Sequence, residues 1–454
     1  MSVNRRQFLQ GMAAVGVAGL TASSSVRQAH GQSPGNPDKP NIVMILPDDI
    51  GWNDVGYHGS EIQTPNVDAL AEGGATFEQH YVTPTCSPTR VGVLTGRQPA
   101  HFNVFGPLGS TTDVQPEDMR LPFGLQDLGY KTHIVGKWHI GDEPEYRPLN
   151  YGFETSYGYL RGQIDPYTHR YKFGDYLTWH RNDEFIEERG HVTDLITEEA
   201  VRLIEDAGDE PFFLVLCHHA PHFPCNEPPS WIEPYEDVFD DVWRQHFAAA
   251  VTHMDDGIGK VIDALDRTGK RENTLVIFSS DNGGQESWGA PETEYNGRYA
   301  AHTTLGDNTP LRGWKGQVYE GGIRVPAFVN WPGKIPGGSV IEPPTQMTDW
   351  APTLIRLGGG EPDPDWQLEG VDLWPLITGE ETSVETRQLF WNHGNRLWAL
   401  REGDWKLIDH GSDQFELFNI AEDPYEERDL AGERPDEEDR LKAALDEWRD
   451  RTQG

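Results

Sequence analysis

Several short apolar runs in this chain have the length of β-strands, and polar residues follow each of them directly. The run "NIVMIL" (41–46) is apolar almost throughout and ends at "PDD". A continuous apolar run of this length is typical of a parallel strand that is buried on both faces. Comparable runs are "KTHIVGKWH" (131–139), "PFFLVLC" (211–217) and "NTLVIFSSDNGG" (273–284). The chain is therefore expected to build its core around a parallel sheet.

Helical patterns lie between these runs. The stretch "TPNVDALAEGGATF" (64–77) begins with a threonine cap and a proline in the first turn, and two glycines end its helical part. Residues 242–265 carry apolar side chains at helical spacing. Strands that alternate with helices predict an α/β fold with a mostly parallel sheet and helices on both faces.

The sequence pattern changes from about residue 385. Short amphipathic runs, "QLFWNHG", "LWALREGDWKLIDH" and "FELFNI", predict antiparallel strands of a smaller domain. An acidic helix over 434–449 is expected to close the chain. The expected organisation is a targeting segment (1–32), a catalytic domain (33–384) and a small C-terminal α+β subdomain (385–454).

The chain is strongly acidic. Its 454 residues carry a formal net charge of -37 at pH 7, which argues against nucleic acid as a partner because such a surface repels polyanions. A smaller anionic substrate would need lysine, arginine and histidine side chains close to its site. Each basic residue near a candidate site is therefore informative.

The N-terminus resembles a twin-arginine export signal. "NRRQFLQ" (4–10) precedes an apolar stretch, "GMAAVGVAGLTA", that is too short to span a bilayer. We expect the protein to be exported by this route to the periplasm or the extracellular space. No later stretch has the length and apolarity of a transmembrane helix, so we do not expect an integral membrane protein.

Acidic and amide side chains follow two of the predicted strands. Asp48 and Asp49 come after the first strand, and Asp281 and Asn282 come after the last. Each pair alone is compatible with an ordinary loop turn. Since the carboxyl ends of parallel strands meet at one edge of a sheet, the two pairs together predict a metal site. Their oxygen atoms favour Ca²⁺ or Mg²⁺ over zinc.

Basic groups follow the other strands. Lys137 and His139 have the spacing that places both on one face of an extended segment. His222 follows the strand at 211–217, and Lys315 lies in the glycine-rich segment "RGWKGQVYEGG". An alternative is a zinc site formed by the three histidines of "HHAPHFP". The prolines there argue against a helix that presents two histidines on one face.

One of the three cysteines lies in "CSPTR". Pro88 suits the first turn of a helix, so Cys86 would lie at a helix N-terminus, where backbone N–H groups favour an anion and would stabilise a thiolate. A nucleophile and a divalent metal surrounded by cationic side chains predict hydrolysis of an anionic ester. Phosphate and sulfate esters are both compatible with this pattern.

These residues resemble the type I sulfatases. The resemblance rests on "CSPTR" with "LTGR", and on "ILPDDIGWNDVGYHG", "GKWHIG", "FSSDNGGQ", "TPLRGWKGQVYEGGIRVP" and "REGDWKLI" in this order. Several phrases are similar to those of arylsulfatase B (N-acetylgalactosamine-4-sulfatase) and of bacterial polysaccharide sulfatases. The resemblance implies an alkaline-phosphatase-like sheet and an enzyme that hydrolyses a sulfate ester of a carbohydrate or an aryl sulfate.

The resemblance also implies a modified cysteine and a bound metal. A formylglycine-generating enzyme would convert Cys86 to Cα-formylglycine, whose hydrated gem-diol attacks sulfur and forms a covalent sulfo-enzyme intermediate. One Ca²⁺ per chain would be held by Asp48, Asp49, Asp281, Asn282 and the modified Cys86.

Basic residues receive roles from the same resemblance. Arg90 and Lys137 would orient the gem-diol and neutralise charge, and His139 would accept a proton from it. Lys315 and His222 would bind the sulfate and protonate the leaving oxygen. A phosphonate or phosphodiester hydrolase of the same superfamily, or a non-catalytic protein that binds sulfated glycans, remains an alternative.

The sequence also suggests residues that contact the substrate. The stretch 157–175 is rich in aromatic and basic residues and is expected to form a substrate loop. The candidate contacts are Arg161, His169, Arg170, His302, Arg312, Trp314 and His393. Cys217 and Cys225 form either a disulfide or two buried thiols, and the sequence leaves both open.

Overall fold

The computed structural model describes residues 39–453 apart from 173–175, 290–293, 395 and 413. The expected targeting segment, 1–32, lies outside the described residues. Within the described part of the chain, no helix combines the length and the apolarity needed to cross a membrane.

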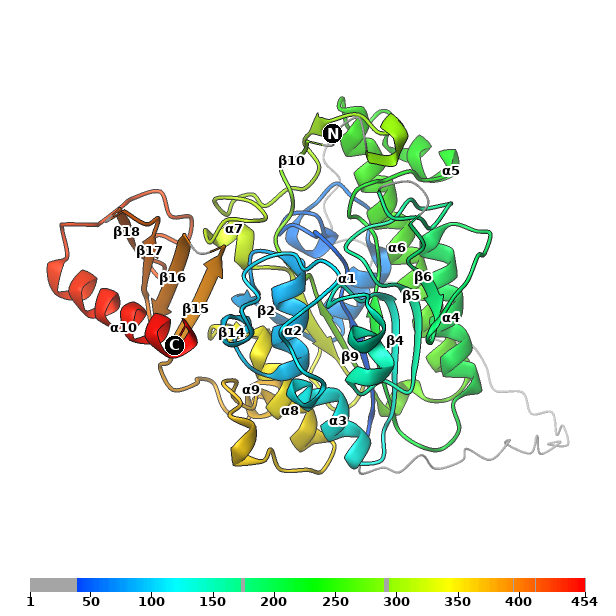
Figure 1. The fold of residues 1–454 in the computed structure, drawn as a ribbon, viewed down its shortest axis with the longest axis horizontal. Coiled ribbons are helices and arrows are strands. Elements are labelled where there is room, and N and C mark those ends of the chain that lie inside the picture. Colours follow the sequence, from blue (N-terminus) through cyan, green and yellow to red (C-terminus); the bar gives the residue numbers. More distant parts are fainter. Residues whose placement is uncertain (1–38, 173–175, 290–293, 395, 413, 454) are drawn as a thin grey trace, which may run out of the picture. The chain divides into compact units, whose positions relative to one another are not determined.

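A ten-stranded mixed sheet forms the core, in the order β13-β2-β12-β9-β1-β8-β4-β5-β6-β7 (Figure 1). The five neighbouring strands from β9 to β5 are parallel to one another, whereas antiparallel pairs occur toward both edges. The parallel strands are β9 (Thr274–Ser279), β1 (Asn41–Ile45), β8 (Phe212–Cys217), β4 (Lys131–Lys137) and β5 (Thr155–Tyr159). The outer strands are β13 (Ser339–Ile341), β2 (Ala75–Phe77), β12 (Ala327–Asn330), β6 (Trp179–Arg181) and β7 (Glu184–Phe185). The predicted fold class is confirmed.

The apolar runs become central strands because both faces of this sheet are covered. Every residue of β1 is buried. Ile42 and Met44 belong to the apolar core on one face, and Val43 and Ile45 belong to the core on the other. Alternate side chains of a strand point to opposite faces, so a strand that is covered on both faces needs apolar residues at most of its positions.

Helices cover the two faces of the sheet (Figure 1). The helices on the face of Val43 are α1 (Pro65–Glu72), α4 (Val192–Asp206) and α6 (Val242–Arg267). The opposite face carries α2 (Cys86–Thr95), α3 (Arg120–Asp127), α8 (Trp350–Leu357) and α9 (Trp374–Thr378). Shorter elements are α5 (Pro229–Ile232), α7 (Glu320–Ile323), β3 (His80–Tyr81), β10 (Ser287–Trp288), β11 (His302–Thr303) and β14 (Thr345–Gln346).

The C-terminal part forms a four-stranded antiparallel sheet, as predicted. Its strands are β15 (Gln388–His393), β16 (Leu397–Glu402), β17 (Trp405–Asp409) and β18 (Phe415–Asn419). The closing helix, α10 (Pro435–Gln453), packs Leu441, Leu445 and Trp448 against one face. The other face packs against Tyr81 and Ile323 of the main sheet domain.

A buried lysine links the C-terminal sheet to the main domain. Lys406, on β17, lies 2.8 Å from a carboxylate oxygen of Glu320 on α7 and 2.8 Å from one of Glu426, and none of the three side chains is exposed. Burial raises the pKa of Glu426 to about 7. Burial acts in the same direction on Glu320, but the cations around it, Lys406 first, hold the pKa of Glu320 below its ordinary value.

We expect Lys406→Met to lower the free energy of unfolding by about 3–5 kcal/mol, because it leaves a buried carboxylate without its partner. Denaturant unfolding measures this change. Lys260→Met is the control, since Lys260 forms an exposed pair with Asp256 and its loss should cost less than about 1 kcal/mol. Equal effects of the two substitutions would contradict the anchoring role of Lys406.

Candidate active site

The carboxyl ends of the parallel strands bring the predicted polar residues together. Asp48 and Asp49 follow β1, and Asp281 and Asn282 follow β9, its neighbour in the sheet. The backbone N–H of Asp49 donates to Asp281 Oδ1 at 3.3 Å, and Asn282 Nδ2 donates to Asp49 Oδ1 at 2.8 Å. Segments that are more than 200 residues apart in sequence therefore share one buried site.

Three cations neutralise the three carboxylates of this site. Lys137 Nζ lies 2.5 Å from Asp48 Oδ2, and Lys315 Nζ lies 2.5 Å from Asp49 Oδ1. Arg90 Nη2 lies 2.8 Å from Asp281 Oδ2. The side chains of Asp48 and Lys137 are fully buried. Charges this deeply buried are tolerated only when they are paired.

Burial and pairing move the pKa values of the carboxyls in opposite directions. Burial raises the pKa of Asp281 to about 6, with the neighbouring Asp48 carboxylate adding to the effect. Burial also raises the pKa of Asp48. Burial opposes ionisation of Asp49 as well, but Lys315, His222 and Lys137 outweigh it and hold the pKa of Asp49 well below its ordinary value.

The donor atoms of this site are suited to a hard divalent cation. Asp48 Oδ1 and Asn282 Oδ1 are buried and have no hydrogen-bond partner among the described residues. Ligand atoms of Asp48, Cys86 and Asp281 lie within 4.8 Å of one another, and so do those of Asp48, Asp49 and His222. Two unpartnered oxygens beside three carboxylates are the kind of donor set that Ca²⁺ or Mg²⁺ uses.

Cys86 lies at the first residue of α2, as its proline-containing sequence predicts. Its sulfur is 3.2 Å from His139 Nδ1, and 2% of the residue is exposed. Burial raises the pKa of the Cys86 thiol, although Lys137 and Lys315 act in the opposite direction. The thiolate stabilisation expected from the helix N-terminus is therefore outweighed by burial, and that expectation is corrected.

Two residues that aim side chains into the site have unusual backbone angles. Asp49 and His139 have φ values of 70° and 61°, in the left-handed region that non-glycine residues rarely adopt. Such conformations cost about 1–3 kcal/mol each and persist where the surrounding contacts impose them. Here they turn the chain at the ends of β1 and β4 so that both side chains face Cys86 and its neighbours.

A cavity of about 740 Å³ opens above Cys86. Cys86, His139, His222 and Lys315 are among the residues that line it. Its lining also includes residues that the sequence did not single out: Gln163, Tyr171, Lys172, Gln285 and Trp288. Three of these lie in or near the expected substrate loop, and Trp288 follows "DNGGQ" closely, but no sequence pattern distinguished their orientation.

Only two of the seven candidate substrate contacts line this cavity, Trp314 and His393. His302 stacks on Trp243 at 4.1 Å between ring centroids. Arg312 lies over the ring of Tyr319 at 4.0 Å.

The remaining three candidates lie on the expected loop and also contact protein groups. His169 stacks on Trp179, Arg170 pairs with Glu187, and Arg161 pairs with Asp142 at 2.6 Å. These five side chains contact protein groups and are not part of the cavity lining, so their role in substrate binding stays a prediction. The last part of the loop, 173–175, lies outside the described residues.

The structure also decides between a disulfide and two thiols for Cys217 and Cys225, and it bears on the zinc site considered as an alternative. Cys217 and Cys225 are free, buried thiols, and Cys225 Sγ donates to the carbonyl of Pro221 at 3.0 Å. Among the described residues, the metal-capable groups include His222 but neither His218 nor His219. The three histidines of "HHAPHFP" therefore do not form the zinc site considered as an alternative.

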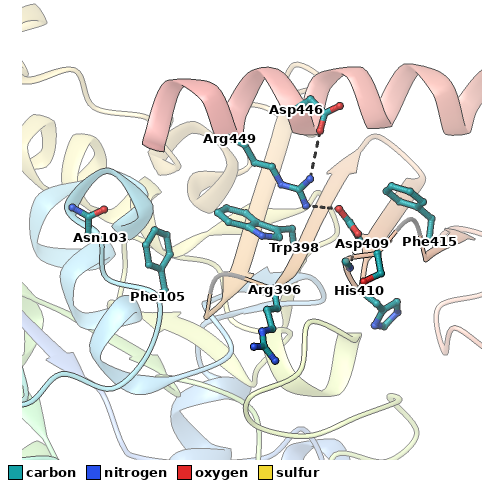
Figure 2. Close-up of a pocket in the computed structure, with 11 residues that line it drawn as sticks. Asn103, Phe105, Arg396, Trp398, Asp409, His410, Phe415, Asp446 and Arg449 are labelled. Atoms are coloured by element: carbon teal, nitrogen blue, oxygen red, sulfur yellow. Dashed lines mark hydrogen bonds and ion pairs between the residues drawn. The ribbon is translucent and has the colours of Figure 1, made fainter. Parts of the chain in front are cut away.

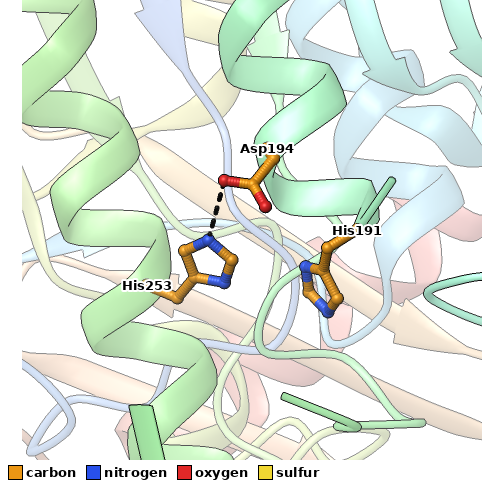
Figure 3. A group of neighbouring side chains, drawn as sticks. All are labelled: His191, Asp194 and His253. Atoms are coloured by element: carbon orange, nitrogen blue, oxygen red, sulfur yellow. Dashed lines mark hydrogen bonds and ion pairs between the residues drawn. The ribbon is translucent and has the colours of Figure 1, made fainter. Parts of the chain in front are cut away.

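A second cluster of titratable side chains lies between α4 and α6, and Figure 3 shows its members His191, Asp194 and His253. His253, on α6, lies 3.2 Å from Asp194 Oδ1 and 2.6 Å from Glu227 Oε2. Burial opposes protonation of His253, but its hydrogen bonds to Asp194 and Glu227 prevail and raise its pKa to about 9. His191 lies beside this pair, with its ring centroid 5.0 Å from that of His253. Glu227 thus ties the segment after β8 to α6.

Two family models match the chain. The model described as "Sulfatase" matches residues 40–360, and the one described as "N-sulphoglucosamine sulphohydrolase, C-terminal" matches residues 313–451. Mouse arylsulfatase J is 33% identical, covering 87% of this chain and 73% of its own length. Mouse N-acetylgalactosamine-6-sulfatase is 32% identical, covering 82% of this chain and 72% of its own length.

Solved structures agree with these relatives. Ps i-CgsB in complex with k-i-k-neocarrahexaose has a TM-score of 0.81 and 29% identity, and the match covers 90% of this chain and 93% of the other. The PsFucS1 sulfatase from Pseudoalteromonas sp. has a TM-score of 0.71 and 25% identity, with 86% of each chain covered.

We expect Ca²⁺ to raise the melting temperature of chelator-treated protein, because a ligand that binds only the folded state stabilises it. Asn282→Ala removes one unpartnered oxygen and should weaken Ca²⁺ binding about tenfold or more in a calorimetric titration. Asn150→Ala is the control, since Asn150 is exposed and lies in the short 3-10 helix Pro148–Tyr151. An unchanged affinity in Asn282→Ala would show that the ion binds elsewhere.

Proposed function

Since this chain belongs to the sulfatase family of sulfuric ester hydrolases, we propose that it removes sulfate from a carbohydrate with an oxidised Cys86 as its nucleophile. The observation that carries the proposal is the position of Cys86. The residue lies at the base of the cavity, next to His139, with Lys137, Lys315 and Arg90 directed at the carboxylates beside it. This arrangement surrounds an incoming sulfate group with cations in a chain whose net charge is -37.

The relatives support a carbohydrate substrate. N-acetylgalactosamine-6-sulfatase is named for a sulfated sugar, and the Ps i-CgsB structure contains a carrageenan-type hexaose. The cavity has aromatic residues near its polar base, including Trp288, Tyr171 and Trp314. Aromatic faces together with a few placed polar groups are typical of sites that bind sugar rings.

Two groups would complete this site. Formylglycine at position 86, once hydrated, supplies an oxygen nucleophile with a second hydroxyl on the same carbon. A divalent cation held by Asp48, Asp49, Asp281 and Asn282 would draw negative charge from the sulfate oxygens. We propose Ca²⁺ because all four residues offer oxygen ligands.

The basic residues around position 86 have positions suited to proton transfer and charge neutralisation. His139 Nδ1 lies 3.2 Å from Cys86 Sγ, so it can accept a proton from an oxygen that replaces the sulfur. Arg90 donates to the carbonyl of Lys137 at 2.8 Å and to Asp281, which holds its guanidinium beneath residue 86. Lys137 and Lys315 contribute positive charge without leaving their carboxylate partners.

His222 is the proposed acid for the leaving oxygen. Its Nδ1 donates a hydrogen bond to the carbonyl of Phe223 at 2.6 Å. Nε2 is therefore the atom that faces the site, 3.9 Å from Asp49 Oδ2. Burial lowers the pKa of His222 to about 3, so Nε2 must take up a proton as the anionic sulfate binds before it can act as an acid. Trp288 covers the ring, with 5.7 Å between centroids, and holds it at the cavity wall.

We further propose export by the twin-arginine route, on the basis of the motif at residues 4–10. This route carries proteins that are already folded, which suits an enzyme whose cysteine must be modified and whose metal site is buried. A sulfated polysaccharide outside the cell is then within reach of the enzyme.

The first experiment is the mass of the proteolytic peptide that contains residue 86, from protein produced with and without a formylglycine-generating enzyme. We expect the aldehyde or its hydrate only with that enzyme, together with release of sulfate from nitrophenyl sulfate. Cys86→Ala is the control. A modified protein that cleaved phosphate diesters faster than sulfate esters would replace this proposal with the phosphoryl hydrolase alternative.

We expect His222→Ala to lose about 10²–10⁴-fold in kcat on a sugar sulfate, because an alcohol is a poor leaving group without an acid. The loss on nitrophenyl sulfate should be less than about tenfold, since nitrophenolate leaves without protonation. His133→Ala is the control, since His133 lies on β4, bonds to the hydroxyl of Thr155 and does not line the cavity, and it should change neither rate. Equal losses on the two substrates would reject the acid role of His222.

A further inference from the structure

We propose that the C-terminal sheet carries a second binding site for a sulfated glycan chain, and that this site extends the catalytic cavity. The site, here named the C-terminal groove, is lined by Phe105, Arg396, Trp398, His410, Phe415 and Arg449, among other residues (Figure 2). This inference takes its substrate class, a sulfated glycan, from the proposed function. It adds a binding site for the sugars beyond the one that loses its sulfate.

The groove is large and has a mixed lining. Its volume is about 950 Å³, larger than the catalytic cavity at about 740 Å³. Strands β16 and β17, helix α10 and the segment after α2 all contribute to its walls (Figure 2). Aromatic side chains beside arginine and aspartate are the chemistry by which proteins hold sugar rings and their anionic substituents.

The groove and the catalytic cavity share a wall. Phe105 lines the groove, whereas Leu108, three residues later, lines the cavity. Across from this segment, Arg396 lines the groove and His393 lines the cavity. The two segments are joined by a hydrogen bond from the N–H of Gly394 to the carbonyl of Phe105, at 2.8 Å. A glycan whose terminal sugar occupies the cavity therefore has to cross only these two segments to reach the groove.

Among the charged side chains that line the groove, Arg396 is the one without an ion pair among the described residues. Arg449 is engaged, with Asp409 at 2.5 Å and Asp446 at 3.4 Å, and its guanidinium lies 5.0 Å from the ring centroid of Trp398. His410 is 2.7 Å from Glu416. Arg396 is exposed, and no ion pair or hydrogen bond of its side chain occurs among the described residues. In Figure 2 its guanidinium points away from the Arg449–Asp409 pair.

Arg396 supplies positive charge in a chain that has 74 acidic and 37 basic residues. A guanidinium binds a sulfate group through two parallel hydrogen bonds, which gives it more specificity than a lysine. Trp398 is mostly covered, but Phe105 and Phe415 are only partly buried and can contact a sugar ring. A small aryl sulfate would occupy the cavity alone, whereas an oligosaccharide of several sugars would occupy both sites.

Binding can be tested without turnover. The Cys86→Ala protein is titrated with chondroitin sulfate and carrageenan oligosaccharides of increasing length, from the disaccharide upward. We expect affinity for at least one series to rise with length, and Arg396→Ala in the same background to lower affinity for the longer members about tenfold. The disaccharide should bind equally to both proteins, and Arg396→Lys should restore part of the affinity.

Arg428→Ala is the matched control, because Arg428 lies in the same C-terminal region and is highly exposed in a pair with Glu433. We expect no change in affinity from it. Affinity that does not depend on length, or equal losses in Arg396→Ala and Arg428→Ala, would overturn the groove proposal. Absence of binding by every oligosaccharide would also overturn it.

Turnover of nitrophenyl sulfate by the modified enzyme reports on the proposed function separately. We expect Arg396→Ala to leave kcat and KM for this small substrate unchanged, while KM for a long oligosaccharide substrate rises about tenfold with little change in kcat. A modified enzyme without activity on any sulfate ester would reject the proposed function. The titration of the Cys86→Ala protein would still show whether the groove binds long oligosaccharides.

Discussion

The pairing of three buried carboxylates with three buried cations is the interaction on which the rest of this site depends. Asp48, Asp49 and Asp281 lie at one edge of the sheet, where parallel strands end together. Carboxylates at such short separations repel one another unless positive charge lies between them. Lys137, Lys315 and Arg90 supply that charge from three other segments. The resulting site is close to neutral, and it can receive both a divalent cation and an anionic substrate.

The site is close to neutral, whereas the chain as a whole carries a large negative charge. A net charge of -37 creates a field that repels sulfated substrates at long range. Salt screens such a field beyond about 10 Å at ordinary ionic strength. Close to Cys86, the buried ion pairs are poorly screened, so the balanced charges of the site determine the local potential more than the net charge of the chain does.

The C-terminal sheet contributes to the site because it is anchored to the main domain. Lys406 links β17 to Glu320 on α7, five residues after Lys315 in the sequence. The apolar face of the sheet packs on Tyr81 and Ile323. These contacts bring the end of β15 to the cavity, where His393 lines its wall. The small subdomain thus forms one side of the space available to a substrate.

The sequence by itself determined the main strands of the sheet and the family of this protein. Runs such as 41–46 had to be central strands, because a strand that is apolar at nearly every position needs cover on both faces. The polar residues after these strands had to meet at one edge of the sheet. The sequence could not determine which side chains face the cavity. Gln163 and Trp288 line it, whereas His169 and Arg312 contact protein groups. The orientation of these side chains depends on the paths of the loops and on contacts between distant segments. Loop sequences have no periodic pattern that would predict it, and the contacts exist only once the chain has folded.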